Sequence, residues 1–369
     1  MAETERHVVV LWDFARSAEA QIARDLSDRF SVVAEMEIEW HKDRFSEQLT
    51  RFYGTRLPRR AHKERHCGTG PFLLFVIEAP VRRALRLTSS GPRTVNPEVF
   101  DAKRMYRAWT GGGHRVHASD TPAEADHDLM LVLGSRCAEV DATSERRRLK
   151  RPIIGSDGYS SLAELFAVLN TGDRWVIMRN WSELEDGLPG DDHPDIDLMV
   201  DDAAGCCRLL GATPTRRLPW RSQFRVLVES RPVLIDLRTP YDGYLPAPLA
   251  ERMLDRRVSG PHGGWIPEGC DHFVSLLYHA VVHKPTLYSG YVALLRGLEH
   301  EIAIPYPASD DRAAWERYLV QLLRAEGLHE TDPVDLSVGN YASGGPRRLT
   351  RRTWEALRTV YRLRKGLSV

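Results

Sequence analysis

Short apolar segments that alternate with helix-like segments are the feature that most restricts the fold of this chain. His7–Leu11 is a β-branched run, and the residues of 17–30 have apolar side chains at helical spacing. Ser31–Glu39 alternates as a strand does, and Pro71–Ile77 is apolar almost throughout. A further short strand at His114–His117 is followed by a strong helix start. This succession of strands and helices predicts an α+β domain.

The second half of the chain repeats strand and helix signals after a polar stretch. Ser161 and Glu164 form a capping box that opens a helix. The strands that we expect after it are Trp175–Met178, Asp195–Val200 and Val233–Leu237, and helical stretches follow at Cys270–His283 and Asp311–Glu326. We therefore predict a first domain at 1–134, a linker at 135–156, a second domain at 157–300 and a helical extension at 301–369.

Charge and cysteine content restrict the class of protein. The chain has 51 basic and 51 acidic residues, so its formal net charge is zero, whereas dedicated DNA-binding proteins usually carry a basic excess. The five cysteines form no CxxC pair and no disulfide framework. The longest apolar runs are far shorter than the ~20 residues of a membrane helix. We expect a cytoplasmic protein with no strong nucleic-acid signal.

Two carboxylates lie two residues apart in the predicted strand at 195–200. Because side chains alternate along a strand, Asp195 and Asp197 are expected on the same face. Paired carboxylates suit a divalent cation such as Mg²⁺ or Mn²⁺, which offsets their repulsion. A third carboxylate, Asp236, lies within the apolar run at 233–237. The alternative is that these are polar positions on half-exposed strands.

A helix, a strand, a turn, an hDhDh strand and a later acidic strand together resemble the polymerase β-type nucleotidyltransferase superfamily. The resemblance covers residues 157–300 and implies a nucleotidyltransferase fold. It implies that Asp195 and Asp197 hold a metal ion against a triphosphate and that Asp236 is a base or a shared metal ligand. The site residues that it implies for phosphate are Arg179, Asn180, Ser182 and Lys284. The Gly-Ser usual in the turn of that family is absent here.

Two histidines near the end of the helical stretch at 270–283 raise a separate possibility. His279 and His283 are four residues apart and so share a helix face. No acidic residue lies between them, so the HExxH pattern of zinc proteases is absent. Packing of both rings in the core is the alternative to metal binding.

The first domain carries a second resemblance, to nucleoside diphosphate kinases. Pro71–Glu78, Asn96-Pro97, Gly113–Asp120 and Ala125–Leu129 match the pattern of that family in order and spacing, and the likeness covers residues 7–134. It implies a ferredoxin-like fold. It also implies that His117 is the phosphorylated histidine and that Asp128 orients its ring. The residues that it places near the phosphates are Ser119, Tyr53 and Arg104.

This second resemblance has a clear departure. Trp12 stands where the family has a phosphate-binding lysine, and His114 replaces an asparagine near the nucleotide sugar. Loss of the lysine removes a charge that stabilises phosphoryl transfer. We therefore expect nucleotide binding, or a vestigial site, rather than full kinase activity.

The expected function combines these observations. We predict a Mg²⁺-dependent nucleotidyltransferase that moves a nucleoside monophosphate from a nucleoside triphosphate to a small-molecule or sugar-phosphate acceptor. One alternative is a phosphotransferase that moves a phospho-alditol or phosphocholine group onto a glycan, and another is a non-catalytic nucleotide-sensing or scaffold protein. The basic stretch at 347–365 could contact an anionic membrane or a polyanion, or dock on its own protein. The sequence leaves the oligomeric state open.

Overall fold

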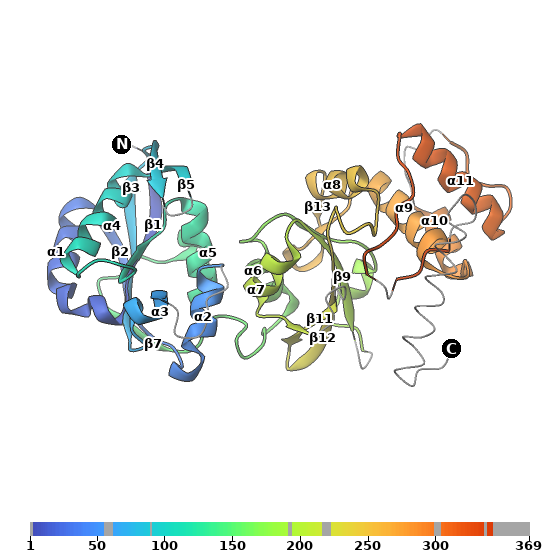
Figure 1. Cartoon of the computed structure of the whole chain (residues 1–369). Helices are drawn as coiled ribbons and strands as arrows, with labels where there is room; N and C mark the ends of the chain where they lie inside the picture. The colour runs from blue at the N-terminus through green and yellow to red at the C-terminus, as the bar shows by residue number, and fades with distance from the viewer. Residues whose placement is uncertain are drawn as a thin grey trace. The chain divides into compact units, whose positions relative to one another are not determined.

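The chain forms two compact units in a computed structural model (Figure 1). The model describes residues 3–54, 62–88, 91–190, 194–215, 223–298, 304–335 and 338–341. The first unit comprises Met1–Gly172, Arg208–Gly211 and Leu227–Ser230, and the second comprises Asp173–Cys207, Ala212–Val226 and Arg231–Val369. The basic stretch at 347–365 lies outside the described residues. None of the helices in the described ranges has the length and apolarity that a membrane crossing requires.

The first unit is built on a mixed five-stranded sheet with the strand order β6-β1-β3-β2-β7. Its strands are β1 (Thr4–Leu11), β2 (Ser31–Glu39), β3 (Phe72–Pro80), β6 (Val116–Ala118) and β7 (Arg147–Lys150). Its helices are α1 (Glu19–Arg29), α2 (Phe45–Phe52), α3 (His62–Cys67), α4 (Pro97–Trp109), α5 (Pro122–Leu133) and α6 (Leu162–Leu169), with 3-10 turns at Asp13–Ala18, Lys42–Arg44 and Cys137–Glu139. Strands β6, β1, β3 and β2 are antiparallel neighbours, and the order β1-α1-β2-β3-α4-β6 is that of a ferredoxin-like fold.

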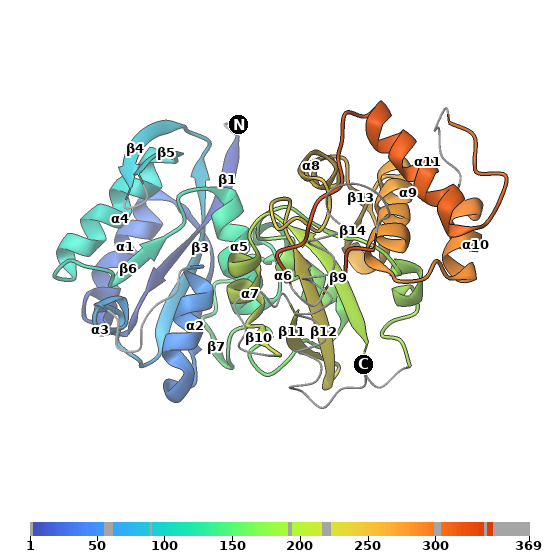
Figure 2. The same ribbon diagram turned by 45° about the vertical axis from the view of Figure 1, so that its right-hand side comes forward.

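The two faces of this sheet have different partners, because side chains alternate along each strand. Val9 and Leu11 of β1 pack in a core with residues of α1 and α4. Helices α2 and α5 lie on the other side of the sheet in both views (Figures 1 and 2). Trp12 belongs to that second side, where it is fully buried.

An aromatic cluster fills the space around Trp12. It consists of Trp12, Trp40, Phe45, Phe52, Tyr53 and Phe72, and the ring centroids of its members lie 4.7–6.4 Å from that of Trp12. The Trp12 indole donates a hydrogen bond to the Tyr53 hydroxyl at 3.1 Å. Trp12 is therefore a packing residue, held by edge contacts of the kind that aromatic rings favour.

The predicted linker at 135–156 is part of the first unit. Its charge run contributes β7, which pairs in parallel with β2. Arg146, just before β7, forms ion pairs with Glu19 of α1 at 2.7 Å and with Glu35 of β2 at 2.5 Å. The local composition looked like a linker because the acidic partners of its arginines lie more than a hundred residues earlier in the chain.

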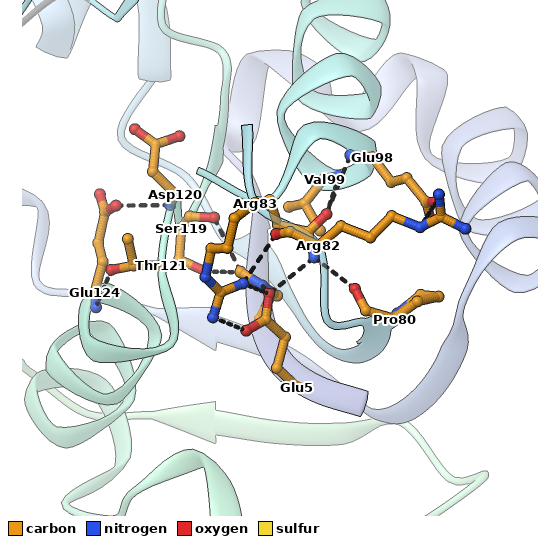
Figure 3. Close-up of polar contacts among 12 residues, drawn as sticks. Glu5, Pro80, Arg82, Arg83, Glu98, Val99, Ser119, Asp120, Thr121 and Glu124 are labelled. Carbon is orange, nitrogen blue, oxygen red and sulfur yellow. Dashed lines mark hydrogen bonds and ion pairs between the residues drawn. The ribbon is translucent and has the colours of Figure 1, made fainter. Parts of the chain in front are cut away.

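A hairpin that the sequence analysis did not predict is anchored at both ends on Glu5. Its strands are β4 (Ala84–Thr88) and β5 (Gly91–Val95). Arg83, before β4, donates two hydrogen bonds to the Glu5 carboxylate at 2.6 Å, and Asn96, after β5, donates a third at 2.9 Å (Figure 3). Burial alone would raise the pKa of Glu5, but hydrogen bonds from Arg83, Asn96 and His7 lower it to about 2.

The second unit has its own five-stranded sheet with the order β10-β11-β12-β9-β8. Its strands are β8 (Trp175–Ile177), β9 (Asp195–Val200), β10 (Thr213–Pro214), β11 (Gln223–Val228) and β12 (Arg231–Arg238), and a separate pair joins β13 (Val258–Ser259) to β14 (Trp265–Ile266). The helical segments are α7 (Ala203–Leu210), α8 (Ala247–Asp255), α9 (Gly269–Tyr278), a π-helix at His279–His283, α10 (Ser289–Gly297) and α11 (Arg312–Ala325), with 3-10 turns at Trp181–Leu184 and Pro261–Gly263. Val176 of β8 and Met199 of β9 pack in one core with residues of α8, α9 and α11.

Candidate functional site

The register of two strands in the second unit brings predicted site residues together. Strand β12 runs parallel to β9, and Asp236 is the register partner of Asp197, while Leu234 is the partner of Asp195. Alternation along β9 puts Asp195 on the same sheet face as Asp197. The three carboxylates thus share one face, on which Asp195 is exposed and Asp197 is buried. We call these three residues the carboxylate face.

Two arginines, Arg238, which is buried, and Arg179, which is partly buried, pair with the carboxylate face. Arg179, two residues past the end of β8 at Ile177, lies 2.8 Å from the Asp197 carboxylate, measured from Nη2 to Oδ1. Arg238, two residues beyond Asp236 in β12, donates to Asp236 at 2.9 Å and to Asp335 at 3.2 Å. The sequence analysis did not single out Arg238, although its spacing from Asp236 in an alternating strand was a usable signal.

The pKa values in this cluster follow from burial and from neighbouring charge. Burial raises the pKa of Asp197, Arg179 lowers it, and the carboxylates of Asp236 and Asp195 raise it again. Burial opposes the charge of Arg179, but Asp197 and Tyr244 raise its pKa above the usual value. Arg179 therefore remains a cation, and its partner carboxylate gains from the charge.

The three carboxylates match a divalent cation in kind, since oxygen ligands are what Mg²⁺ prefers. Among the described residues, no group of three or more His, Cys, Asp or Glu side chains is arranged to hold a metal ion. Asp197 contacts Arg179 and Asp236 contacts Arg238. Guanidinium groups therefore supply positive charge to two of the three carboxylates. The arrangement expected from the sequence is thus present as a shared face but not as a three-carboxylate cage.

The other residues predicted to bind phosphate are Lys284, Asn180 and Ser182. Burial and Arg179 lower the pKa of Lys284, while Asp197 and Asp195 raise it, so Lys284 is close enough to sense the carboxylate face. Asn180 has a left-handed backbone (φ 60°) and begins the 3-10 turn after β8. Ser182 within that turn is exposed.

The two histidines of the π-helix are buried and hydrogen-bonded. Tyr244 Oη lies 2.7 Å from His279 Nδ1, and His279 Nε2 lies 3.2 Å from Tyr291 Oη. His283 Nε2 lies 2.8 Å from the Tyr244 carbonyl, and its Nδ1 lies 3.2 Å from the Gly339 carbonyl. Burial lowers the pKa of His283 to about 4 and that of His279 well below its usual value. These contacts favour the interpretation of both residues as core histidines.

His117 of the first unit also has the carboxylate partner that the sequence predicts. Its neighbours in β6, Val116 and Ala118, face α1 and α4, so alternation turns His117 toward the other side of the sheet. There His117 Nε2 lies 2.7 Å from Asp128 Oδ2. Burial lowers the pKa of His117 to about 4 and raises that of Asp128 to about 8. The pair therefore shares one proton at neutral pH.

The imidazole of His117 is enclosed. It is only 6% exposed, and its ring meets the rings of Phe52 and Tyr53 edge-on at centroid distances of 5.2 and 5.6 Å. Tyr53, which the kinase resemblance places near the phosphates, is thus beside His117. His117 and the aromatic cluster therefore lie on the same side of the sheet.

Ser119 and Arg104 are the two other residues that the kinase resemblance places near the phosphates. Ser119 is fully buried, and its hydroxyl accepts a hydrogen bond from the Val8 backbone at 3.0 Å, so it stabilises β1 (Figure 3). Arg104 is exposed on α4. The cations that affect the pKa of His117 are instead Lys103 and Arg107, one helical turn apart, and the sequence analysis did not select either. The sequence alone does not show which face of α4 lies toward His117 of β6, so it could not select these two residues.

Nucleoside diphosphate kinases are among the solved structures similar to part of this chain. The kinase from Aquifex aeolicus is 19% identical with a TM-score of 0.25, and the match covers 34% of this chain and 93% of the kinase. The kinase from Encephalitozoon cuniculi is 13% identical with a TM-score of 0.26, and the match covers 38% of this chain and 94% of the kinase. No family model and no curated protein matches the chain.

Proposed function

We propose that the second unit is a metal-dependent nucleotidyltransferase that moves a nucleoside monophosphate from a nucleoside triphosphate to a small-molecule or sugar-phosphate acceptor. The observation that supports it best is the parallel register that places Asp236 beside Asp197, with Asp195 on the same face. The order β8, turn, β9 and β12 in the second unit, preceded in the chain by α6 of the first unit, is the order that the nucleotidyltransferase resemblance requires. Cationic side chains border this face, as a triphosphate site needs.

In this proposal each residue has a separate task. Asp195 and Asp197 would hold Mg²⁺ or Mn²⁺, which supplies the positive charge that offsets the charge on the triphosphate. Asp236 takes the proton of the acceptor hydroxyl or shares the metal ion. Arg179 and Lys284 bind phosphate oxygens, and Arg179 suits this role because its planar guanidinium can donate two hydrogen bonds.

The Arg179–Asp197 pair adds a step to binding. Arg179 already lies against Asp197, so an incoming triphosphate that draws the guanidinium toward its own oxygens competes with Asp197 for the same cation. If Arg179 turned to the phosphate, Asp197 would lose this counter-charge, and a divalent cation held by Asp195 and Asp197 would supply positive charge in its place. Triphosphate and metal are therefore expected to bind with positive coupling.

For the first unit we propose a structural role without phosphohistidine chemistry. Burial of His117 among Phe52, Tyr53 and the other rings of the aromatic cluster supports this proposal. Trp12, in the place of the phosphate-binding lysine of the family, belongs to that cluster and brings no charge to the site. The sequence expectation of nucleotide binding by this unit stays a prediction.

The nucleotidyltransferase proposal is tested by pyrophosphate release. The full chain would be incubated with each nucleoside triphosphate, MgCl₂ and a fractionated metabolite extract, and pyrophosphate would be measured, with Asp195→Asn as the matched control. Release by the wild-type chain alone supports the proposal. Release of CMP from a CDP-linked donor, without pyrophosphate from triphosphates, would instead identify a phospho-alditol or phosphocholine transferase.

A further inference from the structure

A continuous row of hydrogen bonds leads from the carboxylate face to helix α10. It runs from Asp197 to Arg179 at 2.8 Å, on to Tyr244 Oη at 3.0 Å, to His279 Nδ1 at 2.7 Å and from His279 Nε2 to Tyr291 Oη at 3.2 Å. We call these five residues the Tyr291 chain. Its members come from β9, the turn after β8, the segment before α8, the π-helix and α10.

The protons along the Tyr291 chain can be assigned from donor and acceptor chemistry. Arg179 has only donors, so the Tyr244 oxygen accepts from it and the Tyr244 hydroxyl proton is left for His279 Nδ1. A neutral imidazole has one acceptor and one donor nitrogen. Burial and the nearby Arg179 keep His279 neutral by lowering its pKa. Its proton is therefore on Nε2, which donates to the Tyr291 oxygen.

This assignment leaves one donor without a partner. The Tyr291 oxygen accepts from His279, and its own O–H has no acceptor among the residues that the structure describes. The side chain is partly buried, and burial raises its pKa, so the phenol keeps its proton at neutral pH. Through His279, Tyr244 and Arg179, the phenol is linked to Asp197 of the carboxylate face.

We propose that the Tyr291 hydroxyl donates a hydrogen bond to a phosphate oxygen of the bound nucleoside triphosphate, which makes Tyr291 a binding residue of this site. The inference rests on the proposed function of the second unit. Arg179 and Lys284 beside the same face favour an anionic ligand oxygen as the acceptor. A donor held in place through His279 and Tyr244 needs little reorganisation when that oxygen arrives.

The phosphate group of a sugar-phosphate acceptor has the same hydrogen-bonding chemistry, so the test includes both sources. Binding to the full chain would be measured calorimetrically for each of the four nucleoside triphosphates with MgCl₂, for inorganic tripolyphosphate and for glucose 1-phosphate. Tyr291→Phe removes the donor and keeps the ring. We expect its Kd for the preferred triphosphate and for tripolyphosphate to rise about ten-fold or more, the usual effect of losing a hydrogen bond to a charged group.

Tyr288→Phe is the matched control. Tyr288 lies just before α10, its ring centroid is 6.5 Å from that of Tyr291, and it is 52% exposed. Loss of its hydroxyl should leave every Kd unchanged. A second measurement needs no variant: ¹⁵N NMR of the imidazoles in the wild-type chain should show His279 neutral and protonated on Nε2.

The outcomes separate this inference from the proposed function. If the wild-type chain binds neither a nucleoside triphosphate nor tripolyphosphate, the proposed function fails. If the wild-type chain binds them and Tyr291→Phe binds them equally well, the inference fails and the proposed function stands. If Tyr291→Phe raised the Kd for glucose 1-phosphate alone, the assignment of the hydrogen bond to the nucleotide would be overturned. His279 protonated on Nδ1 would overturn the direction of the Tyr291 chain.

Discussion

The guanidinium of Arg179 lies 2.8 Å from the Asp197 carboxylate, and both side chains are mostly buried. Asp195, two residues earlier on the same strand, is exposed. The two carboxylates that look equivalent in the sequence therefore differ in environment. Asp197 balances the charge of Arg179, so it contributes to the stability of the folded state as well as to any chemistry. Asp195 is exposed and makes no such contribution to stability.

Asparagine substitutions at 195 and 197 should separate chemistry from stability. We expect both Asp195→Asn and Asp197→Asn to lower metal-dependent turnover by about 100-fold or more, because each removes a metal-binding charge. Asp197→Asn should also lower the free energy of unfolding by about 3 kcal/mol, since Arg179 loses its counter-charge. Asp195→Asn should change it by less than about 0.5 kcal/mol. Pyrophosphate assays and urea unfolding measure the two effects. Turnover within a few-fold of wild type in either variant would contradict the metal-site assignment.

Labelled ATP should leave His117 unmodified. The ring is 6% exposed and packed against Phe52 and Tyr53, so little of it is open to the γ-phosphate of ATP. We expect no acid-labile label above that of His117→Ala after incubation with Mg²⁺–ATP. Stoichiometric label that disappears in His117→Ala would show that the enclosure opens and that the first unit retains kinase chemistry.

The His117–Asp128 pair should give stability a recognisable pH dependence. In the folded unit the pair binds one proton between about pH 4 and about pH 8. In the unfolded chain, histidine loses its proton near about 6.5 and aspartate near about 3.9. Between about pH 4 and 6.5 both states thus carry one proton, and the pair contributes no slope. From about 6.5 to 8 only the folded pair holds a proton, so its stabilisation falls as the pH rises.

Asp128→Asn isolates this behaviour. Without the carboxyl group, the lowered pKa of buried His117 remains, so the free energy of unfolding should rise with pH up to about 6.5 and then level off. Urea unfolding of both proteins from about pH 4 to about pH 9 would give the difference in slope. Parallel curves across the whole range would mean that the pair does not share a proton.

The carboxylate of Glu5 should make the first unit sensitive to acid. Because its pKa falls from the usual range to about 2 in the folded protein, its stabilisation is present above about pH 4.5 and is lost as the pH falls toward about 2. Glu5→Gln should flatten this part of the stability curve. Amide hydrogen exchange in β4 and β5 should become faster in the variant, because Arg83 and Asn96 lose their common acceptor. Unchanged exchange there would argue against Glu5 as the anchor.

Local signals in the sequence predicted most elements but few of their contacts. The start of α6 was identified correctly, since the Ser161 side chain accepts from the Glu164 amide and α6 begins at Leu162. The Glu164 carboxylate accepts from the Ser160 amide rather than from that of Ser161, so the predicted capping box is only half formed. Strand alternation likewise predicted the shared face of Asp195 and Asp197. In contrast, the parallel register of β12 on β9 depends on tertiary packing, which alternation within one strand cannot specify.

The partners of the arginines were beyond sequence reasoning for a related reason. Arg238 contacts Asp335 across 97 residues of chain, and Arg146 contacts Glu19 and Glu35 more than a hundred residues away. Hydrophobic periodicity carries no information on such pairs. The hairpin of β4 and β5 was missed although Leu85 and Leu87 alternate with polar residues, and both leucines are exposed rather than part of a core.

The rings around Trp12 also restrict which residues can replace it. A lysine at position 12 would put an ammonium group among Trp40, Phe45, Phe52 and Phe72, which offer no carboxylate to balance it. Acquiring a phosphate-binding cation there would therefore require several neighbouring replacements at once, each unfavourable without the others. A single substitution at position 12 is therefore not expected to introduce a phosphate-binding cation beside His117.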